Sequence, residues 1–491
     1  MGFTKDTKAM TDVSHRGTEP QRKLMSRYES KSSCSLSVNL RASVALCETG
    51  LLAETAIMDA AREVARVLAR AGFQAYFAGG CVRDALLGRV LKDVDIATSA
   101  SPAQVERLFE GRTVSVGKAF GVIIVRQGGF SFDVATFRTD GTYADGRHPE
   151  AVCFSTPEHD AQRRDFTVNG LFCNPESGEV IDFVGGMADM DARVIRAIGD
   201  PEARFREDHL RMLRAVRFAS VLSFRLDEVT RDAVARHAGW ITRVSAERIA
   251  VELVRMLCES PRPSVGLSLL LETGLLAQVL PEVVALRGTE QPPQYHPEGD
   301  VWTHTCLMLD DLPAPRDPDL ALGVLFHDIG KPPTFRVAPD DETGQLRIRF
   351  PCHAAVGARM TEKILTRLKL PAERIGAVTA LVHEHMHFVD AQKMRRSTLR
   401  RFLGNPLFPK MLSLVRLDIT HSNGDFSTWD FLKSSYDAFT DEPVLPEPKI
   451  RGRDLLALGF KPGPTMGKLL AELYDAQLEG RLDEAMARFL K

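Results

Sequence analysis

The 491-residue sequence lacks the features that mark membrane, secreted and fibrous proteins. It has no apolar run that approaches the roughly 18 to 20 residues of a membrane-spanning helix. Its 8 cysteines include no CxxC pair, so neither a zinc ribbon nor a disulfide framework is indicated. Glycine and proline are unremarkable, and hydrophobic residues make up 44% of the chain, as in ordinary globular proteins. Together these absences predict a cytoplasmic protein that has no membrane partner.

A strong excess of charge of either sign is also missing. The formal net charge is −2, so binding of a nucleic acid would depend on a local basic surface.

The first 50 residues or so contain no apolar core of about 7 to 15 residues, and they are therefore not a secretory signal. We expect residues 1–55 to form a disordered extension, with a natural start at Met58 as the alternative.

The length of the chain predicts about two to four domains. Residues 56–187 combine helical and strand patterns, which favours an α+β domain. Helical periodicity dominates residues 188–288, and a histidine-rich helical region follows at 289–432. Residues 433–491 contain two apolar helical runs separated by the turn-like pair Gly463-Pro464. We therefore expect a multidomain chain with an α+β head, an all-α neck, a second helical domain and a helical tail.

The head contains a strand, a glycine turn and a helix in direct succession, a layout that is suited to phosphate binding. The strand is expected at Ala75–Ala78 and the helix at Val82–Leu87. Backbone N–H groups at Gly79 and Gly80 can approach a triphosphate because no side chain intervenes. Arg83 follows one turn into the helix, where its cation can reach the same phosphates.

Carboxylates on two predicted strands form a candidate metal site. Asp93 and Asp95 are two residues apart on a strand expected around Val94–Ala97, so both carboxylates face the same side. Asp133 alternates with apolar residues in a strand expected at Phe130–Phe137. Three carboxylates suit two Mg²⁺ ions about 4 Å apart, one lowering the pKa of an attacking hydroxyl and one neutralising pyrophosphate. An isolated DxD pair is most often merely solvated, so this inference depends on the combined pattern.

A second pattern predicts selection of a base. The segment RFREDHLRMLRAVRF places Asp208, Arg211, Arg214 and Arg217 at i, i+3 spacing, which indicates one polar stripe along a helix. A carboxylate beside a guanidinium can imitate a Watson–Crick edge, because one group accepts from an exocyclic amine and the other donates to the ring. Such an edge accepts CTP and ATP and rejects UTP and GTP, which carry carbonyls instead of amines. The alternative is an ordinary amphipathic helix with exposed ion pairs.

Four ordered motifs resemble those of class II tRNA nucleotidyltransferases and bacterial poly(A) polymerases, within the DNA polymerase β-type superfamily. The motifs are GGCVRDALLGRVLKDVDIAT, RRDFTVNGLF, REDHLRMLRAVRFA and VSAERIAVEL, and the resemblance covers about residues 58–285. Gly170 departs from the family pattern, which more often has alanine there, and this glycine could loosen the local helix. Poly(A) polymerases usually carry a basic GRRFR-like segment where this chain reads VGKAFGVIIV, which favours a tRNA nucleotidyltransferase.

The resemblance implies a role for each matched residue. Asp93 and Asp95 would bind the catalytic Mg²⁺, and Gly80 with Arg83 would bind the triphosphate. The other implied residues are Arg164 and Asp165 at the ribose and phosphates, Asp208 and Arg211 as the template for C and A, and Arg214 and Arg217 in support. The implied partners are tRNA, CTP and ATP, with no DNA and with the oligomeric state left open.

Histidine and aspartate residues further along the chain resemble the H…HD…D signature of the HD phosphohydrolase superfamily. The predicted metal ligands are His304, His327, Asp328 and Asp418, with His353 and His385 as candidates for a second metal or a phosphate. Imidazole and carboxylate ligands suit Mg²⁺, Mn²⁺ or Ni²⁺ and a water molecule activated by the metal. Lys331 follows HDIG and is expected to help bind an anion. The resemblance implies phosphatase or 2′,3′-cyclic phosphodiesterase action, although HD domains in this family are either catalytic or structural.

The sequence therefore predicts a tRNA nucleotidyltransferase with an HD domain. Alternatives are an enzyme that adds only CC or only A, a poly(A) polymerase, an RNA-binding HD phosphohydrolase and a non-catalytic tRNA-binding scaffold. Intact Asp93, Asp95, Asp208 and Arg211 argue against the last two. The tail segment GRDLLALGFKPGPTMGKLL resembles a helical segment that holds tRNA in family members, although structural packing explains it equally well.

Overall fold

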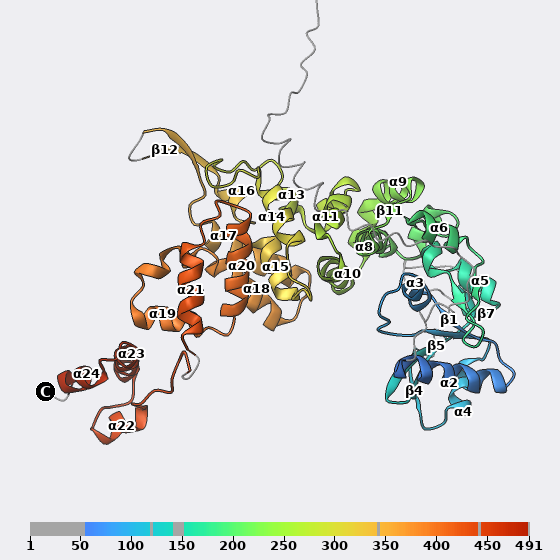
Figure 1. The fold of residues 1–491 in the computed structure, drawn as a ribbon, viewed down its shortest axis with the longest axis horizontal. Helices are drawn as coiled ribbons and strands as arrows, with labels where there is room; N and C mark the ends of the chain where they lie inside the picture. Colours follow the sequence, from blue (N-terminus) through green and yellow to red (C-terminus); the bar gives the residue numbers. More distant parts are fainter. Residues whose placement is uncertain (1–54, 118–120, 141–151, 341–343, 440–442, 490–491) are drawn as a thin grey trace, which may run out of the picture. The chain divides into compact units, whose positions relative to one another are not determined.

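The computed structural model describes residues 55–117, 121–140, 152–340, 344–439 and 443–489 (Figure 1). The extension predicted over residues 1–55 lies outside the described residues, apart from Thr55. Among the helices of the described residues, none is both long enough and apolar enough to cross a membrane.

A seven-stranded mixed sheet forms the centre of the head. Its strand order is β3-β4-β5-β2-β1-β8-β9, with β2 and β5 parallel and the other neighbouring pairs antiparallel. The strands are β1 (Ala75–Ala78), β2 (Ile96–Thr98), β3 (Thr113–Gly117), β4 (Val122–Gln127), β5 (Phe130–Thr136), β8 (Phe172–Cys173) and β9 (Val180–Ile181). The predicted α+β head is thus confirmed.

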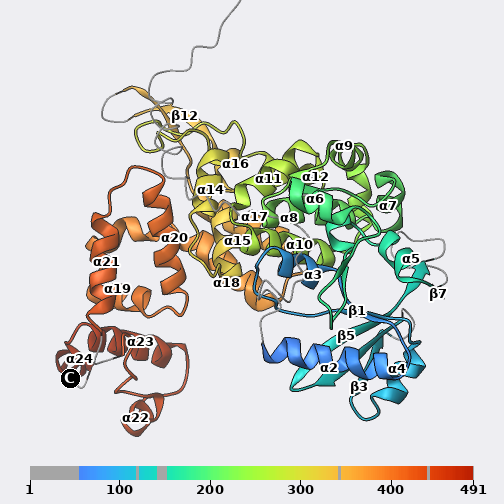
Figure 2. The ribbon, with the colours of Figure 1, turned by 45° about the vertical axis from the view of Figure 1, so that its right-hand side comes forward.

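Helices α2 (Ala56–Arg70) and α4 (Pro102–Leu108) pack against this sheet (Figure 2). Helix α2 forms because its apolar residues recur at helical spacing and because the Thr55 side chain accepts from the N–H of Met58 at its start. Val64 and Leu68 of this helix are fully buried. Helix α3 (Gly80–Leu86) follows the strand through the glycine turn, as the sequence predicts, but begins at Gly80 and not at the predicted Val82.

The carboxylate pair lies just before its strand and not within it. Because β2 begins at Ile96, Asp93 and Asp95 belong to the extended segment that leads into the strand. The alternation that the sequence predicts still holds, since Val94 and Ile96 are buried whereas both aspartates are exposed. Both carboxylates therefore remain on the solvent-facing side of this segment.

Short elements connect the sheet to the neck. They are β6 (Arg138–Asp140), β7 (Val152–Phe154), α5 (Pro157–Gln162), the 3-10 helix η2 (Thr167–Asn169) and α6 (Gly186–Ala192). Gly170 ends η2, and a Cβ atom at this position would lie 2.6 Å from Cγ2 of Val184 and 3.3 Å from the carbonyl oxygen of Thr167. Gly170, which departs from the family pattern, therefore lies where the surrounding atoms leave little room for a side chain.

The neck is helical, with one small addition that sequence periodicity did not predict. A pair of parallel two-residue strands, β10 (Val194–Ile195) and β11 (Arg225–Leu226), joins its first helices. The helices are α7 (Pro201–Glu207), α8 (Arg211–Leu222), α9 (Glu228–His237), η3 (Ala238–Arg243), α10 (Ala246–Glu259), α11 (Pro263–Glu272), α12 (Leu275–Val279) and α13 (Pro281–Val284).

The predicted polar stripe from Asp208 to Arg217 is wrong at its first residue. Asp208 has extended backbone angles and ends α7, so it does not share a helix with Arg211. Its carboxylate accepts from the N–H of Leu210 at 3.1 Å, which satisfies a backbone donor at the start of the next helix. Aspartate competes for local backbone donors in this way and favours helix ends over helix interiors. Arg211, Arg214 and Arg217 do follow one another along α8.

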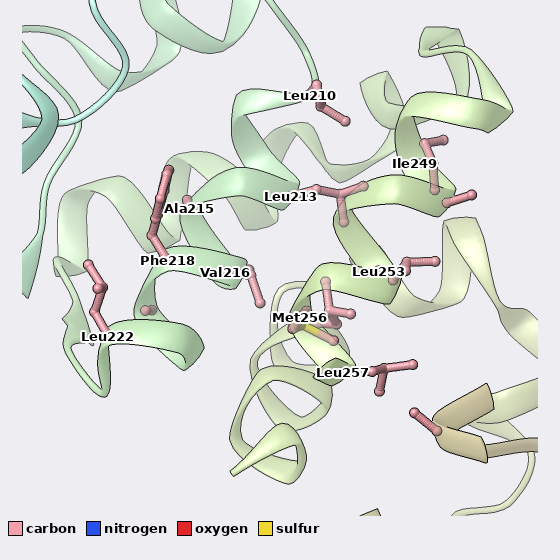
Figure 3. Close-up of a cluster of buried hydrophobic side chains, with 14 of the residues drawn as sticks. Leu210, Leu213, Ala215, Val216, Phe218, Leu222, Ile249, Leu253, Met256 and Leu257 are labelled. Carbon is pink, nitrogen blue, oxygen red and sulfur yellow. The ribbon is translucent and has the colours of Figure 1, made fainter. Parts of the chain in front are cut away.

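The apolar side of α8 packs against α10 (Figure 3). Leu213 and Val216 of α8 and Leu253 and Met256 of α10 belong to one buried cluster. A Cβ atom at Gly266 would lie 2.5 Å from the sulfur of Met256, so α11 also approaches closely. This packing holds the arginine-bearing helix rigidly beside α10.

The third region is also helical and carries a hairpin that was not predicted. Strands β12 (Arg336–Pro339) and β13 (Leu346–Arg349) pair in antiparallel fashion. The helices are α14 (Val301–Asp310), α15 (Pro318–Phe326), α16 (Lys331–Thr334), α17 (His353–Arg367), α18 (Ala372–Glu384), η4 (His387–Lys393), α19 (Arg396–Leu403), α20 (Phe408–Thr420) and α21 (Ser427–Asp437).

The tail consists of α22 (Gly452–Ala457), α23 (Pro464–Leu478) and α24 (Leu482–Phe489). Leu455, Leu469 and Leu473 form its own small apolar cluster. The predicted turn at Gly463-Pro464 joins the first two helices, with Pro464 in the first turn of α23. Proline is well tolerated at that position because its missing N–H has no partner there in any case.

Candidate active sites

The three predicted carboxylates of the head lie in β5 and in the segment that leads into the neighbouring strand β2. Asp95 precedes Ile96 and Asp133 precedes Val134, and these two following residues are register partners of β2 and β5. The pKa of Asp95 is raised to about 6, first because the surrounding protein removes part of its hydration and then because Asp93 and Asp133 carry like charges. Concentrated negative charge of this kind favours the binding of cations.

The three carboxylates do not form a close cluster in this structure. Among the described residues, the groups whose ligand atoms all lie within 4.8 Å of one another do not include Asp93, Asp95 and Asp133. Divalent cations would have to draw the three side chains together. The residues nevertheless fit Mg²⁺, because it prefers oxygen ligands and is usually held by one or two carboxylates together with substrate phosphates.

Two guanidinium groups flank the glycine turn. Gly79 has φ +75°, and a Cβ atom there would lie 2.7 Å from Nη1 of Arg164, so a side chain would be both strained and obstructed. Arg164 donates from Nη1 to the carbonyl oxygen of Asn169 at 3.3 Å. Arg83 is buried and donates from Nη1 to Oδ1 of Asn169 at 2.5 Å. Asn169 thus holds both cations beside the turn, where a triphosphate would meet positive charge.

Asp165 links the head to the neck. Its Oδ2 accepts from Nε and Nη2 of Arg214 at 2.9 and 2.7 Å, and its Oδ1 accepts from Nδ2 of Asn169 at 2.9 Å. Burial alone would raise the pKa of Asp165, but Arg214, Asn169 and Arg211 outweigh it and lower the pKa to about 2. The carboxylate is therefore charged at neutral pH and bonded in two directions, which fixes α8 relative to η2.

Asp208 and Arg211, the predicted base-selecting pair, each have other partners. Asp208 accepts through Oδ2 from Nη2 of Arg248 at 2.7 Å. Arg211 donates from Nη1 to Oε2 of Glu207 at 2.6 Å and from Nη2 to the carbonyl oxygen of Arg163 at 3.0 Å. The two side chains are thus held in place by different partners and are not bonded to each other by any of these contacts.

Arg217 lies deeper, next to Glu252 of α10. Its Nε donates to Oε2 of Glu252 at 2.5 Å, and both side chains are buried. Glu252 also lies 3.7 Å from Nη1 of Arg214. Glu252 and Arg248 belong to the motif VSAERIAVEL, so the sequence marked their segment without assigning their contacts.

The structure gathers all six predicted residues of the histidine site. Nε2 of His327 lies 3.1 Å from Oδ2 of Asp328, and Nε2 of His353 and of His385 lie 3.6 and 3.8 Å from Oδ1 of the same residue. Nε2 of His304 lies 3.2 Å from Oδ1 of Asp418. Two groups have all ligand atoms within 4.8 Å: His304, His327 and Asp328, and Asp328, His353 and His385.

Hydrogen bonds to the main chain orient three of these imidazoles. Nδ1 of His327 lies 2.8 Å from the carbonyl oxygen of Val324, and Nδ1 of His385 lies 2.7 Å from that of Val382. His353 makes the same kind of contact at 3.0 Å. An imidazole that donates from Nδ1 keeps its lone pair on Nε2, which is the form that binds a metal.

The unsatisfied atoms of the cluster fit a divalent metal. Nε2 of His304 and of His327 are buried without a well-formed hydrogen bond, although a carboxylate oxygen lies near each. Buried polar atoms normally have such a partner. Burial also lowers the pKa of His385 to about 3, so this imidazole is neutral and available as a ligand at neutral pH.

Glu298 is a residue of this site that the sequence interpretation missed. Its Oε1 lies 2.7 Å from Nδ1 of His304 and 2.9 Å from Nδ1 of His296. Burial would raise the pKa of Glu298, but these two imidazoles lower it to about 2. The segment HPEGD, which ends four residues before His304, was the only signal, since a carboxylate near a ligating histidine often orients it.

A cavity of about 870 Å³ opens above the metal-binding residues. Its wall includes Lys331, Arg336 and Arg349 as cations and Tyr295 and Phe350 as aromatic side chains. Nζ of Lys331 lies 2.7 Å from Oδ2 of Asp328 and donates to Oε1 of Gln291 at 2.6 Å. The predicted role of Lys331 near an anion therefore agrees with its place in the cavity wall.

Comparison with known families assigns three consecutive parts of the chain. Residues 75–196 match the poly A polymerase head domain, and residues 223–286 match the probable RNA and SrmB- binding site of polymerase A. Residues 299–420 match the HD domain.

Among curated proteins, the chain is similar to bacterial CCA-adding enzymes. It is 45% identical to that of Levilactobacillus brevis over 218 residues, which cover 44% of this chain and 54% of that enzyme. It is 50% identical to that of Bacillus subtilis over 195 residues, which cover 40% of this chain and 49% of that enzyme. The chain thus spans about half the length of these curated relatives.

Solved structures are similar over most of the chain. The Bacillus stearothermophilus CCA-adding enzyme in complex with CTP is 28% identical with a TM-score of 0.67, covering 88% of this chain and 97% of that one. The Thermotoga maritima CCA-adding enzyme complexed with tRNA_CCA is 21% identical with a TM-score of 0.56, covering 90% and 98%. At the lower identity the likeness shows the fold alone.

A polymerase head, an RNA-binding neck and an HD domain in this order define a nucleotidyltransferase architecture. The chain thus contains the poly A polymerase head domain and the HD domain of these family models, and its similarity to CCA-adding enzymes indicates a nucleotidyltransferase.

Proposed function

We propose that the protein is a tRNA nucleotidyltransferase that adds C and A to the 3′ end of tRNA from CTP and ATP without a nucleic-acid template. The observation that carries the proposal is the combination of the carboxylate group in the head with the arginine-bearing helix α8 in the neck, linked by the ion pair of Asp165 and Arg214. The CCA-adding enzymes to which the chain is similar support the same reaction. We place this reaction in the cytoplasm.

The residues of the head divide the chemistry among them. Mg²⁺ bound by Asp93, Asp95 and Asp133 would lower the pKa of the tRNA 3′-hydroxyl and stabilise the leaving pyrophosphate. Arg83 and Arg164 hold the triphosphate beside the glycine turn and place its α-phosphorus toward the hydroxyl. Because Asn169 fixes both guanidinium groups before substrate binds, little reorganisation is needed at the moment of transfer.

Base selection is assigned to Asp208 and Arg211. A carboxylate accepts about four hydrogen bonds, so Asp208 retains acceptor capacity for an exocyclic amine after bonding Arg248 and Leu210. Arg211 donates three hydrogen bonds, to Arg204, Glu207 and Arg163. Because a guanidinium has five N–H donors, Arg211 retains donor capacity for a base. These partners orient the hydrogen-bonding groups that Asp208 and Arg211 present to the incoming base.

This proposal is tested by supplying purified protein with tRNAs that end before CCA, after CC, or after CCA, together with one labelled nucleoside triphosphate at a time. CTP should extend the first substrate, ATP the second, and no triphosphate the third. Failure of ATP to extend the second substrate would identify a CC-adding enzyme, and failure of CTP to extend the first would identify an A-adding enzyme. Extension of the complete tRNA by ATP would identify a poly(A) polymerase. We also propose the domain boundaries: the head comprises residues 56–187, the neck 188–288, the HD domain 289–432 and the tail 433–491.

We further propose that the HD domain hydrolyses phosphate monoesters or 2′,3′-cyclic phosphates. The supporting observation is the buried group of His304, His327 and Asp328, with Oδ1 of Asp418 3.2 Å from His304, beside a cavity with cationic walls. A divalent metal held by these residues would activate water for attack on phosphorus. Lys331 would attract the phosphate, and the nearby Phe350 would contact an attached nucleoside.

The hydrolase proposal is tested with Mg²⁺, Mn²⁺ and Ni²⁺ separately and with both substrate types. Imidazole nitrogen suits the transition metals, so Mn²⁺ or Ni²⁺ should support hydrolysis better than Mg²⁺. A preparation that extends tRNA well but hydrolyses neither substrate with any of these metals would mark the domain as structural.

A further inference from the structure

A second group of metal-binding side chains lies on the outer side of the segment that contributes His385. Residues 383–387 read HEHMH, which places two histidines four residues apart with a glutamate after the first. His385, between them, is buried and directed at Asp328, whereas His383 and His387 have exposed side chains. This segment therefore directs His385 toward the buried HD site and leaves His383 and His387 accessible to solvent.

The ligand atoms of His383, Glu384 and His387 all lie within 4.8 Å of one another. Nδ1 of His383 is 2.8 Å from Oε1 of Glu384, and Nδ1 of His387 contacts Oε2 of the same carboxylate. The two imidazole rings are 5.7 Å apart and nearly perpendicular. A carboxylate between two imidazoles offers a mixed nitrogen and oxygen ligand set that suits divalent transition metals.

The sequence H-E-x-x-H is also found in metalloproteases, where both histidines lie on one helix and the glutamate acts as a base. That geometry is absent at this segment, because α18 ends at Glu384 and His387 opens the 3-10 helix η4. Glu384 is also the residue that both imidazoles contact, which makes it a ligand candidate and not a base held away from the metal.

We propose that His383, Glu384 and His387 form an outer site for a divalent transition metal such as Ni²⁺ or Zn²⁺, distinct from the buried HD site. The site is open to solvent, so the metal would complete its coordination with water and exchange freely. It would join the end of α18 to the start of η4. Met386, Phe388 and Val389 of that junction line the cavity, so an occupied outer site would stiffen one wall of it.

The outer site is tested by counting bound Ni²⁺ in the full-length chain after equilibrium dialysis. The background is His327→Ala with Asp328→Ala, which disables the buried site. Adding His383→Ala and His387→Ala to this background should lower the count by one equivalent per chain, and Glu384→Gln alone should weaken binding. Asp390→Asn is the matched control, because Asp390 is an exposed carboxylate of η4 outside the group.

A metal count that is the same with and without His383 and His387 would overturn the proposal, as would an equal loss in Asp390→Asn. Circular dichroism of each variant reports folding. Because His383 and His387 are exposed and Glu384 is only partly buried, the substitutions should leave it unchanged. Nucleotide addition by the outer-site variant should equal that of the parent, so failure here is distinguishable from failure of the proposed transferase function.

Discussion

Replacing Asp165 by asparagine isolates the ion pair that links the head to α8. The amide is nearly isosteric and keeps an acceptor for the N–H of Phe166, but it loses the negative charge that Arg214 contacts at 2.7 Å. A carboxyl group whose pKa falls from 3.8 to about 2 on folding contributes about 2 kcal/mol at neutral pH. Because the Arg214 side chain is 31% exposed and Glu252 lies nearby, the cost should stay below the roughly 3 to 5 kcal/mol of a fully buried broken pair.

The pH dependence of this cost follows from the direction of the pKa shift. A lowered pKa stabilises the folded protein above the unfolded value of 3.8, and this stability is lost as the pH falls through about 2. The difference between wild type and Asp165→Asn should therefore be about 2 kcal/mol at pH 6 and roughly half as large at pH 3.

Native-state hydrogen exchange of the α8 amides measures this difference locally, which is preferable because a multidomain chain need not unfold in one step. Asp232→Asn serves as the control, since that carboxylate is 61% exposed and its ion pair should contribute little. A difference below about 0.5 kcal/mol at pH 6, or one that is equal at pH 6 and pH 3, would refute the reasoning.

Four further predictions address the two sites. Asp93→Ala should abolish nucleotide addition while leaving the melting temperature and tRNA binding nearly unchanged, because an exposed metal ligand contributes to the reaction more than to packing. Normal nucleotide incorporation by this variant would contradict the assignment of the head as the catalytic domain. Asp208→Ala should relax base choice by on the order of 1 to 3 kcal/mol, read as the ratio of kcat/KM for CTP and UTP, and a slower enzyme with unchanged preference would contradict the template. The double change His327→Ala, Asp328→Ala should remove metal-stimulated phosphate hydrolysis and spare nucleotide addition, and loss of both activities would show that the sites are not independent. Glu298→Gln should weaken metal binding by the HD site about 10- to 100-fold, because it orients His304, whereas an unchanged affinity would make Glu298 a packing residue.

Periodicity predicted the head closely because its elements depend on local pattern. The strand at Ala75–Ala78 has the bounds that the sequence indicates, whereas the helix after it begins at Gly80, two residues before the predicted start. The helix break at Asp208 was not predicted, since i, i+3 spacing continues through it, whereas the carboxylate instead satisfies a backbone N–H. The short strands β10 and β11 were missed as well, because two-residue pairings depend on tertiary contacts more than on pattern.

The convergence of the six HD-site residues could be predicted because their order along the chain is distinctive, but the contacts around them could not. Glu298 orients His304 through a distance that only the folded chain defines. The outer group at His383 and His387 was hidden because His385, lying between them, had already been assigned to the buried site. Residues that alternate between two sites at such short spacing can be separated only when the direction of each side chain is known.

The most direct measurement is the identity and order of nucleotides that the purified wild-type protein adds to a tRNA ending before CCA, with all four triphosphates supplied together and the products sequenced. Protein-templated selection by Asp208 and Arg211 predicts two C residues followed by a single A, after which addition stops. Products that contain U or G, an open-ended run of A, or no addition while the fold is intact would contradict it.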